Sequence, residues 1–516
     1  MEFKKPQSAD QVSGNLYGST MGKIEANADG NIHLNNKLST GLLLHYQDNL
    51  ASHDDNKDGF LDEPDVRQFN LQNRWAWISP QYIFQASIKA LKEDREGGQT
   101  AHRHGAMSMP ATGELFKTRM ETNRYEAFMK NAYIFNPEHN SNIALILSGS
   151  LHDAEAAYGH KGYDVIQKNF YASLLFETDF TEAHKLSAGL SFNHDHYKEL
   201  YLPDLSADIR PAHTREQEST SGAYLQYTYN WQEKLVLMGG IRMDYNRAFG
   251  TFVTPRAHLK YAPSDIFSVR LSAGKGYRTV HALAELNNLL ASGRQLVIDP
   301  MKQEQAWNYG FSTTFHLPIA GKTLNLNAEY YYTNFSQQAV VDYDSNPSVI
   351  HVTNLDGKSY SHTVQIDATY PLFQGFTLTA AYRLNDVKST YGGKLMERPL
   401  TSKSKGLLTA SYSTPLGIWQ FDATLQINGG GRMPTPDAAQ PLWQERFHSY
   451  EQLSAQVTRF FRHWSIYAGG ENLTGFKQKN PIIGAENPWS STFDPTLIWG
   501  PVTGAMAYVG IRINLE

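Results

Sequence analysis

The residues from Asp54 to Asp65 have the spacing of a calcium-binding loop. Such a loop places oxygen ligands at positions 1, 3, 5, 7, 9 and 12 of its segment, with glycine at position 6. These ligand positions are occupied in turn by Asp54, Asn56, Asp58, the carbonyl of Phe60, Asp62 and Asp65. Gly59 is at position 6, where glycine permits the sharp turn. The segment therefore predicts a structural Ca²⁺ site, with an ordinary acidic surface loop as the alternative.

Two features set this segment apart from an EF-hand. Position 12 carries Asp65, whose side chain is one methylene shorter than that of the usual glutamate. Closure around the ion by both carboxylate oxygens is therefore less assured. No helical pattern flanks the segment on either side. We expect an EF-hand-like loop that is carried by strands.

A second candidate lies in the next long polar segment, where His102, His104, Met107 and Met109 fall close together. Two imidazoles and two thioethers suit a soft metal such as Cu(I). A polar loop with incidental histidines is the alternative. Counting turns along the chain places this loop and the calcium-like loop at the same end of the fold.

A third group is His194 and His196, with Asp195 between them. Their spacing puts both imidazoles on one face of an extended strand, near its outer end. That face either lines the mouth of a lumen or lies at a solvated rim. No arrangement of Ser, His and Asp, or of paired carboxylates, has a spacing that indicates an enzyme active site.

The elements that must position these loops are two-faced strands, and the last stretch of the chain shows the pattern most clearly. Every second residue of this stretch is apolar: Ala505, Ala507, Val509, Ile511, Ile513 and Leu515. The alternate positions are mostly glycine and polar residues. Such alternation predicts a strand with one apolar and one wet face. A terminal strand of this kind needs a partner, and pairing with the first strand would close a barrel.

The same alternation recurs along the chain. Short turns such as Ser79-Pro80-Gln81 and Ile319-Ala320-Gly321 separate strands at one end, and long polar loops, such as residues 48–65 and 92–115, separate them at the other. Counting strands in this way gives roughly 22, a size at which a barrel has a wide lumen. A soluble propeller or β-helix is the alternative, but no repeat of blade or coil length is visible.

Composition narrows the class further. The chain has 516 residues, no linker-like segment and no cysteine, which excludes disulfides, thiol catalysis and Cys-ligated zinc. Its net charge of −5 argues against a nucleic-acid-binding protein. No apolar run approaches the roughly 18 residues of a membrane helix. A transmembrane β-barrel, whose strands need only alternate residues to be apolar, remains the predicted fold.

The most distinctive part of the sequence supports this fold by resemblance. Five segments occur in a typical order and spacing: Gly274-Lys275-Gly276-Tyr277-Arg278-Thr279, a loop with Ala284-Glu285-Leu286-Asn287-Asn288, the strand restart Glu304-Gln305-Ala306-Trp307-Asn308-Tyr309-Gly310, the segment Gly470-Glu471-Asn472-Leu473-Thr474 and the terminal strand. In this respect the chain resembles the barrel of TonB-dependent outer-membrane receptors, particularly those of Bacteroidetes-like bacteria, over nearly its whole length. Lys4-Lys5-Pro6 is similar to the family's junction between plug and barrel.

The resemblance implies an all-β, transmembrane antiparallel barrel with short periplasmic turns and long extracellular loops. It further implies residence in the bacterial outer membrane and uptake of a scarce nutrient, such as a ferric siderophore, cobalamin, haem or another metal complex. A passive porin-like or surface-binding barrel, or an inactive truncated fragment, is the alternative function. The expected partners are outer-membrane lipid, the nutrient and a surface lipoprotein, but not nucleic acid.

Two departures from the family pattern shape the expected domain organisation. The family has an N-terminal plug and a TonB-contacting box, whereas only residues 1–10 precede the predicted barrel, as a remnant of the plug–barrel junction. Residues 11–516 are expected to form the barrel. Contact with the TonB complex is therefore expected only if a plug is supplied. The family's last strand usually ends in an aromatic residue, whereas this chain ends in Leu515-Glu516.

Overall fold

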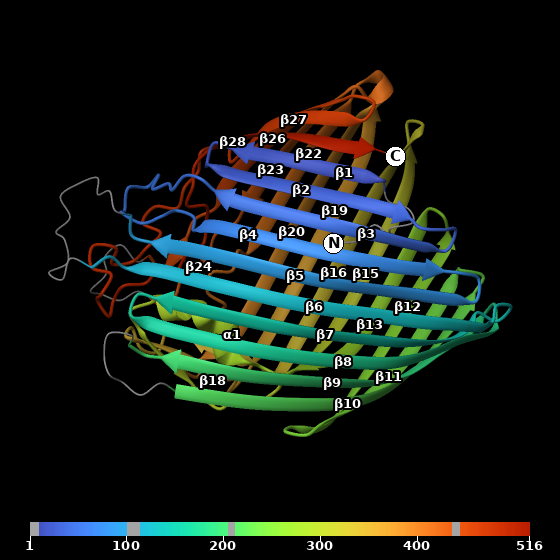
Figure 1. Ribbon diagram of the computed structural model, residues 1–516, viewed down its shortest axis with the longest axis horizontal. Helices are drawn as coiled ribbons and strands as arrows, with labels where there is room; N and C mark the ends of the chain where they lie inside the picture. The colour runs from blue at the N-terminus through green and yellow to red at the C-terminus, as the bar shows by residue number, and fades with distance from the viewer. Residues whose placement is uncertain (1–9, 101–113, 205–211, 436–443, 516) are drawn as a thin grey trace.

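The computed structural model describes residues 10–100, 114–204, 212–435 and 444–515. Within these residues the chain forms one closed antiparallel barrel, whose strands run obliquely around a central lumen (Figure 1). A single sheet contains 23 strands, and one of them, β21, is a short strand beside the end of β20. The remaining 22 strands complete the circle, as the sequence predicted.

The barrel strands are connected in chain order, each to the next. They are β1 (Val12–Ser19), β2 (Lys23–His33), β3 (Leu38–Asn49), β4 (Asp65–Ile78), β5 (Tyr82–Gly98), β6 (Lys117–Asn136), β7 (Ser141–Tyr158), β8 (Lys161–Thr181), β9 (His184–Leu202), β10 (Ala212–Trp231), β11 (Leu235–Asn246), β12 (Gly250–Ser264), β13 (Phe267–Arg278), β15 (Glu304–Ile319), β16 (Lys322–Gln337), β19 (Ser359–Phe373), β20 (Phe376–Tyr391), β22 (Ser404–Ser413), β23 (Trp419–Asn428), β26 (Tyr450–Phe460), β27 (Trp464–Glu471) and β28 (Met506–Leu515).

The smaller elements lie in the long connections. They are α1 (Ala282–Leu286), η1 (Asn287–Ala291), β14 (Gln295–Ile298), β17 (Ala339–Asp342), β18 (Val349–Asn354), β21 (Lys394–Glu397), β24 (Gly431–Arg432) and β25 (Arg446–Phe447), with η2 (Pro415–Gly417) in a short turn. Helical structure in the described part of the chain is limited to α1 and the two 3₁₀ turns. None of these has the length and hydrophobicity that a membrane-spanning helix requires.

The barrel closes where the last strand pairs with the first. β28 is antiparallel to β1 from Val12↔Leu515 to Ser19↔Tyr508, and it also pairs with β27. At this seam Gly510 lies beneath the ring of Tyr467, whose hydroxyl donates to Asn15 Oδ1 at 3.0 Å. Arg512 stacks on the same ring at 4.3 Å. The predicted closure is confirmed.

Side chains alternate between the outer face and the lumen on nearly every barrel strand. On β28 the predicted apolar positions Val509, Ile511, Ile513 and Leu515 face outward and are exposed. Because these residues have no protein partner over most of their surface, the outer wall is an apolar band of the kind that a lipid bilayer covers. The inner positions are largely polar.

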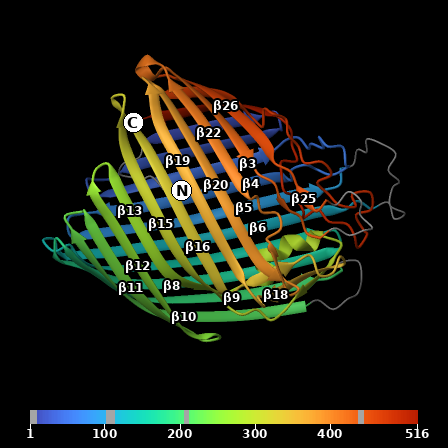
Figure 2. The same cartoon turned by 180° about the vertical axis from the view of Figure 1, so that it is seen from behind.

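The two ends of the barrel differ in the length of their connections. Turns such as residues 79–81, 182–183 and 320–321 join strands at one end, which lies to the right in Figure 1. Most connections at the other end are longer, although residues 20–22, 159–160 and 247–249 are short turns there. Four of the long connections span residues 50–64, 279–303, 338–358 and 472–505. Figure 2 shows these long connections, with α1, gathered at the same end when the barrel is viewed from behind.

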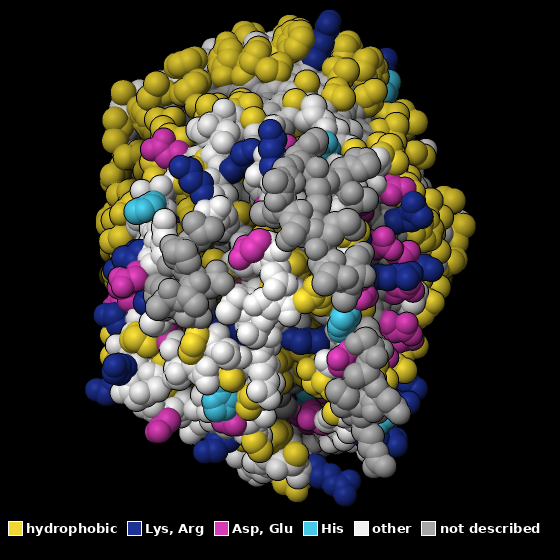
Figure 3. Space-filling view, turned by 90° about the vertical axis from the view of Figure 1, so that its left-hand side faces the viewer, with side chains coloured by type: hydrophobic (Ala, Val, Ile, Leu, Met, Phe, Trp, Pro, Cys, Tyr) yellow, Lys and Arg dark blue, Asp and Glu magenta, His cyan; other side chains and the backbone are white. Residues whose placement is uncertain are grey.

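The buried hydrophobic clusters of the molecule lie at the long-loop end. One contains Phe60, Phe116 and Phe493, from three different connections. A neighbouring cluster packs Leu290 against Tyr163 and other inner-face residues of β7 and β8. The long connections therefore pack into a common structure across this end, which we call the cap. Figure 3 shows hydrophobic side chains along the top and the upper sides of this end, and polar and charged side chains nearer its centre.

Two local predictions were wrong. The long loop expected at residues 92–115 begins later, because β5 continues to Gly98 and pairs with β6 beyond the apolar band. The segment from Ala284 to Asn288, expected as loop, forms α1 and the start of η1. Both errors have the same origin, since the strands and connections here extend beyond the apolar band, where alternation no longer marks them.

Candidate functional site

The calcium-like segment forms a tight loop between β3 and β4. The carboxylate of Asp54 accepts backbone hydrogen bonds from Asp58 (3.1 Å) and Gly59 (3.0 Å), and Asp58 Oδ1 accepts one from Phe60 (2.9 Å). Gly59 has a φ of 84°, a backbone conformation that would be strained in a residue with a side chain. Asn56 Oδ1 also accepts from the Asp58 amide. The backbone thus curls around the ligand positions predicted from the sequence.

The acidic groups of this loop are partly buried, and their negative charges lie close together. Asp58 Oδ2 and Asp62 Oδ1 are buried without a hydrogen-bond partner. Burial raises the pKa of Asp58, and burial together with the charges of Asp55, Asp54 and Asp58 raises the pKa of Asp62 to about 6. Oxygen atoms in this state suit a hard cation, which would remove the electrostatic cost of their ionisation.

The loop as it stands is not a complete metal centre. Among the described residues, no group of three or more His, Cys, Asp or Glu side chains is arranged to hold a metal ion. Asp65, at position 12, begins β4, and its Oδ2 accepts from Ser52 Oγ at 2.8 Å. The Ca²⁺ site therefore stays a prediction, which requires Asp65 to turn toward the other ligands.

The remaining histidine predictions have different outcomes. His102, His104, Met107 and Met109 lie outside the described residues, so the soft-metal site stays a prediction. His194 lies on the outer face of β9, where its Nδ1 is 2.8 Å from Ser219 Oγ, and His196 lies on the same face. These two imidazoles are at the rim, not in the lumen. The expected junction, residues 1–10, is described only at Asp10.

The inner face of β8–β10 carries a polar cluster that the segment before α1 covers. His281 lies one residue before α1 and stacks on the ring of Tyr197 at a centroid distance of 3.9 Å. Its Nδ1 is 3.0 Å from Glu216 Oε2, and its Nε2 is 3.9 Å from Glu218 Oε2. We call Tyr197, Glu199, Glu216, Glu218 and His281 the luminal cluster.

The positions of these side chains follow from strand register. Glu216 on β10 is directly opposite Tyr197 on β9, and Glu199 on β9 is directly opposite Val165 on β8. The side chains of these four residues therefore point to the same side of the barrel wall. The covering segment is fixed from the other side. Thr279 Oγ1 donates to Glu218 Oε1 at 2.8 Å.

The rest of the covering segment is held by ion pairs and hydrogen bonds. Arg278 pairs with Glu285 at 2.7 Å and with Glu304 at 2.7 Å. At the far end of α1, Tyr158 donates its hydroxyl proton to Asn287 Oδ1 at 2.6 Å. Alternation on the strands and these contacts on the loop together bring His281 over the carboxylates.

A cavity of about 280 Å³ lies beside the cluster, beneath α1. His152, Gln167 and Tyr163 line it from β7 and β8, and Tyr163 donates to Glu199 Oε1 at 2.6 Å. Glu285 lines it from α1. The cavity thus offers aromatic rings, the imidazoles of His152 and His281 and the carboxylate of Glu285 in the part of the lumen near the long connections.

The electrostatics of the cluster favour positive charge. Burial alone would lower the pKa of His281, but the hydrogen bond to Glu216 and the charges of Glu216, Glu218 and Asp195 outweigh burial, and its pKa is raised. Even with His281 protonated, the carboxylates outnumber it. A ligand that presents a cationic or metal-bearing group would gain from this surface, because opposite charges attract strongly where water is scarce.

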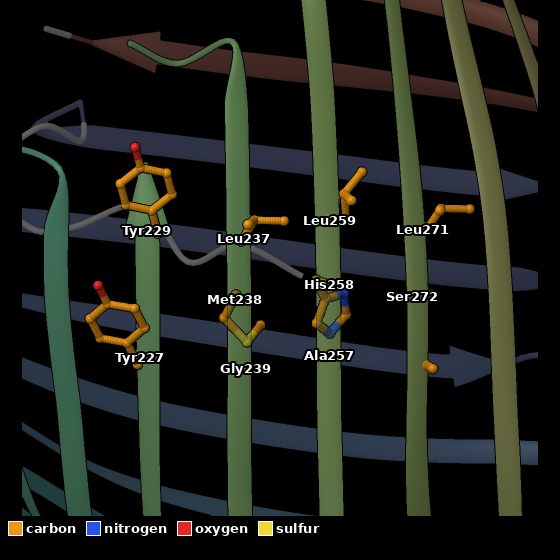
Figure 4. A pocket seen from close by; sticks show the side chains of 11 residues that line it. Tyr227, Tyr229, Leu237, Met238, Gly239, Ala257, His258, Leu259, Leu271 and Ser272 are labelled. Atoms are coloured by element: carbon orange, nitrogen blue, oxygen red, sulfur yellow. The ribbon is translucent and has the colours of Figure 1, made fainter. Parts of the chain in front are cut away.

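A second surface depression is of a different kind. It has a volume of about 560 Å³ and lies on the outer wall, where Gly239, Ala257 and Ala273 leave space between larger side chains. Figure 4 shows Tyr227, Leu237 and other large residues around it. Polar groups do not converge there, and its position in the apolar band indicates contact with lipid.

The luminal cluster was not predicted from the sequence. Its residues come from three separate segments, and closing the barrel brings them together. One signal was available: Asp195, Tyr197 and Glu199 alternate with outward residues, and Glu216 and Glu218 do the same on the next strand. Inward polar alternation near a long-loop end marks a luminal surface.

Comparison with known families and structures gives a consistent result. The family model described as "TonB dependent receptor-like, beta-barrel" matches residues 21–473. No curated protein has a matching sequence.

Several solved structures share the fold over almost the whole chain. The copper transporter OprC has a TM-score of 0.75 at 11% identity, over 98% of this chain and 80% of that chain. The siderophore receptor PiuA from Acinetobacter baumannii has a TM-score of 0.68 at 13% identity, over 99% and 82%. The FpvAI–pyocin S2 complex has a TM-score of 0.71 at 13% identity, over 99% and 74%. At these identities the likeness concerns the fold alone.

Proposed function

Since this chain belongs to the TonB-dependent receptor-like β-barrel family, and is therefore a protein of the bacterial outer membrane, we propose that it forms the wall and the outer binding surface for uptake of a scarce nutrient. The nutrient is of the metal-complex kind, such as a ferric siderophore, cobalamin, haem or a copper complex. Members of this family are receptors and transporters, not enzymes.

The observation that carries the proposal is the luminal cluster at the extracellular end of the lumen. His281 and Tyr197 line the cavity, and the carboxylates of the cluster lie beside them on the inner face of the wall. A binding site at this level receives ligand from outside before the ligand meets any deeper part of the lumen. The excess of carboxylates favours a ligand that presents positive charge, and the aromatic rings favour a flat or ring-bearing one.

The cap supports a receptor over a passive porin. Arg294 and Asp494, from two different connections, form an ion pair at 3.3 Å, and their side chains are 1% and 0% exposed. Phe493 is buried among aromatic rings of two further connections. An end covered by packed connections suits selective capture of one ligand better than free diffusion of many. Energy-coupled transport would further need a plug and the TonB complex, which the family implies.

The test measures ligand binding to the purified barrel in detergent, using a panel of ferric siderophores, haem, cobalamin and copper complexes. His281→Ala should weaken binding of the recognised ligand by about tenfold or more, because it removes a ring that lines the cavity and the contacts that hold Tyr197 and Glu216 in place. The matched control is His258→Ala, which removes an inner-face histidine of β12 outside the cluster.

Two results would contradict the proposal. One is that no member of the panel binds, while planar bilayers show a large and constant ion conductance, as a passive pore would give. The other is that His258→Ala weakens binding as much as His281→Ala does. In that case the luminal cluster is not the binding surface.

A further inference from the structure

The cavity beneath α1 is lined by an imidazole with an unsatisfied ring nitrogen. Strand register places His152 on the inner face of β7, opposite Gln167 on β8, and both side chains line the cavity. The Nδ1 atom of His152 is buried and has no hydrogen-bond partner. Because buried polar atoms are nearly always hydrogen-bonded, this atom indicates a group that enters the cavity and supplies the missing partner.

The imidazole of His152 is suited to accept a hydrogen bond. Burial, and after it the positive charge of Arg124, lower the pKa of His152 against the effect of Asp153, so the ring is uncharged at neutral pH. A neutral imidazole with its proton on Nε2 has a free lone pair at Nδ1. Arg124 is opposite His152 on β6, but its Nε donates to Glu126. His152 is thus an acceptor for a ligand that donates a hydrogen bond.

Most hydrogen-bond donors around the cavity already have protein acceptors. Three side chains that line it donate to protein oxygens: Tyr163 to Glu199 at 2.6 Å, Gln167 to Asp195 at 3.2 Å and Asn287 to the Ala284 carbonyl at 2.8 Å. The Nδ1 atom of His281 faces Glu216. The hydroxyls of Thr122 and Tyr197, which can donate or accept, remain. An anionic group would therefore find few donors in this cavity.

The charges near the cavity favour a cationic group. Glu285 lines it, and the nearby Arg278 is shared between Glu285 and Glu304, at 2.7 Å from each. In the part of the chain that the structure describes, Asp195 accepts from amide groups only and forms no ion pair. The faces of the Tyr197 and Tyr163 rings also attract positive charge.

The size of the cavity limits what can enter it. Its volume of about 280 Å³ is below the roughly 300–1,000 Å³ of a complete small-molecule site. It therefore suits one end of a ligand, and the rest of the ligand would lie outside it.

We propose that this cavity binds a primary ammonium or guanidinium group at one end of the nutrient, and that His152 is the residue that selects for this group. One N–H of the cation donates to His152 Nδ1, and Glu285 balances its charge. The adjoining carbon atoms of the ligand pack against Tyr163 and Tyr197. The inference rests on the proposed function, because it assigns a chemical class to the ligand of that site.

The experiment measures binding of tyramine, a small aromatic amine, to the full chain in a neutral detergent by ligand-observed NMR. Two analogues are compared with it. N,N,N-trimethyltyramine keeps the ring and the charge but has no N–H donor on its nitrogen, and 3-(4-hydroxyphenyl)propionate carries a carboxylate in place of the ammonium group.

Three variants isolate the role of His152. His152→Phe keeps a ring but removes the acceptor, whereas His152→Gln keeps an acceptor. The matched control is His258→Phe, which changes an inner-face histidine of β12 outside this cavity. Unheated gel migration checks that all three variants are folded.

The unmodified chain and His258→Phe should bind tyramine about tenfold more tightly than its trimethyl analogue, because a charged donor gains a buried acceptor. His152→Phe should lose this preference, and His152→Gln should retain much of it. The carboxylate analogue should bind more weakly than either amine. Equal affinities of the unmodified chain for tyramine and its trimethyl analogue would overturn the proposal, and so would no binding of tyramine up to about 10 mM.

The same preparations separate this inference from the proposed function. If tyramine does not bind while a metal-complex nutrient still depends on His281, the amine site is wrong and the proposed function stands. If tyramine binds with the expected dependence on His152 while no metal complex binds, the amine site stands and the proposed kind of nutrient is wrong.

Discussion

At the scale of single residues, chemistry is concentrated at the extracellular end, in two different settings. In the calcium-like loop the carboxylates of Asp58 and Asp62 are partly buried, and each has one oxygen atom without a partner. In the luminal cluster the partners are already in place, since His281 lies between Glu216 and Glu218. A cation would stabilise the carboxylates of the calcium-like loop, whereas the proton on His281 stabilises the carboxylates of the luminal cluster.

The calcium prediction can be tested by proteolysis. In the unmodified chain, Ca²⁺ should protect the segment 54–65 from protease, because the ion would tie its ligands together. Asp58→Ala removes the ligand at position 5 and should abolish this protection. Lys57→Ala, in the same loop but outside the ligand positions, is the control and should keep it. Protection that is unchanged in Asp58→Ala would count against a bound ion.

The His281 contact predicts a pH dependence of the cap. Because the folded-state pKa of His281 is raised, its contribution to stability is fully present below about pH 6.5 and is lost as the pH rises through the raised value. The groups that face it are Glu216, Glu218 and Asp195. Protease resistance of the segment 279–291 should therefore decrease between pH 6 and 9. His281→Gln should remove this pH dependence, and a variant that retained it would assign the effect to other groups.

At the scale of elements, the closing strand pair depends on close packing as well as on alternation. A Cβ atom at Gly510 would lie 2.2 Å from Tyr467 Cζ and 2.7 Å from the carbonyl oxygen of Leu16. No ordinary side chain fits there without moving the ring or the neighbouring strand. At the seam, β27, β28 and β1 therefore pack together through the small residue Gly510 and the large residue Tyr467.

We expect Gly510→Ala to destabilise the barrel by about 1–3 kcal/mol, the usual cost of overpacking. The measurement is the denaturant midpoint at which the folded form is lost in unheated gels. Gly239→Ala is the matched control, since nothing lies within 4 Å of a Cβ atom at that position. If the two substitutions had the same effect, packing at the seam would not limit stability.

At the scale of the whole molecule, the cap contains the buried hydrophobic clusters, whereas the barrel wall is a single sheet. The clusters around Phe493 and Leu497 draw on connections from distant parts of the chain. Asp344 pairs with Arg432 at 2.8 Å and accepts from the Thr435 amide, and these contacts lower its pKa against the effect of burial. The cap is thus held by long-range packing and by ion pairs.

Breaking the most buried pair should loosen the cap. Asp494→Asn removes a buried carboxylate partner of Arg294, and breaking a buried ion pair from one side costs about 3–5 kcal/mol in comparable cases. We expect faster trypsin cleavage at Lys477 and Lys479 and a higher ion conductance in planar bilayers. Arg294→Met/Asp494→Asn, which removes the guanidinium charge as well, should recover much of the protection. Unchanged cleavage and conductance in Asp494→Asn would show that this pair does not hold the cap.

The sequence by itself determined the fold class, the strand count, the closure of the barrel and its place in a lipid boundary. It could do so because a two-residue period is local: Val509, Ile511 and Ile513 face lipid whichever strand lies beside them. The ligand spacing of Asp54, Asn56 and Asp58 is local in the same way. Only the tertiary structure decided that His281 lies over Glu216, 65 positions away in the chain, and that Arg294 meets Asp494. Those contacts depend on the packing of the long connections against one another, and no pattern within a single segment encodes that packing.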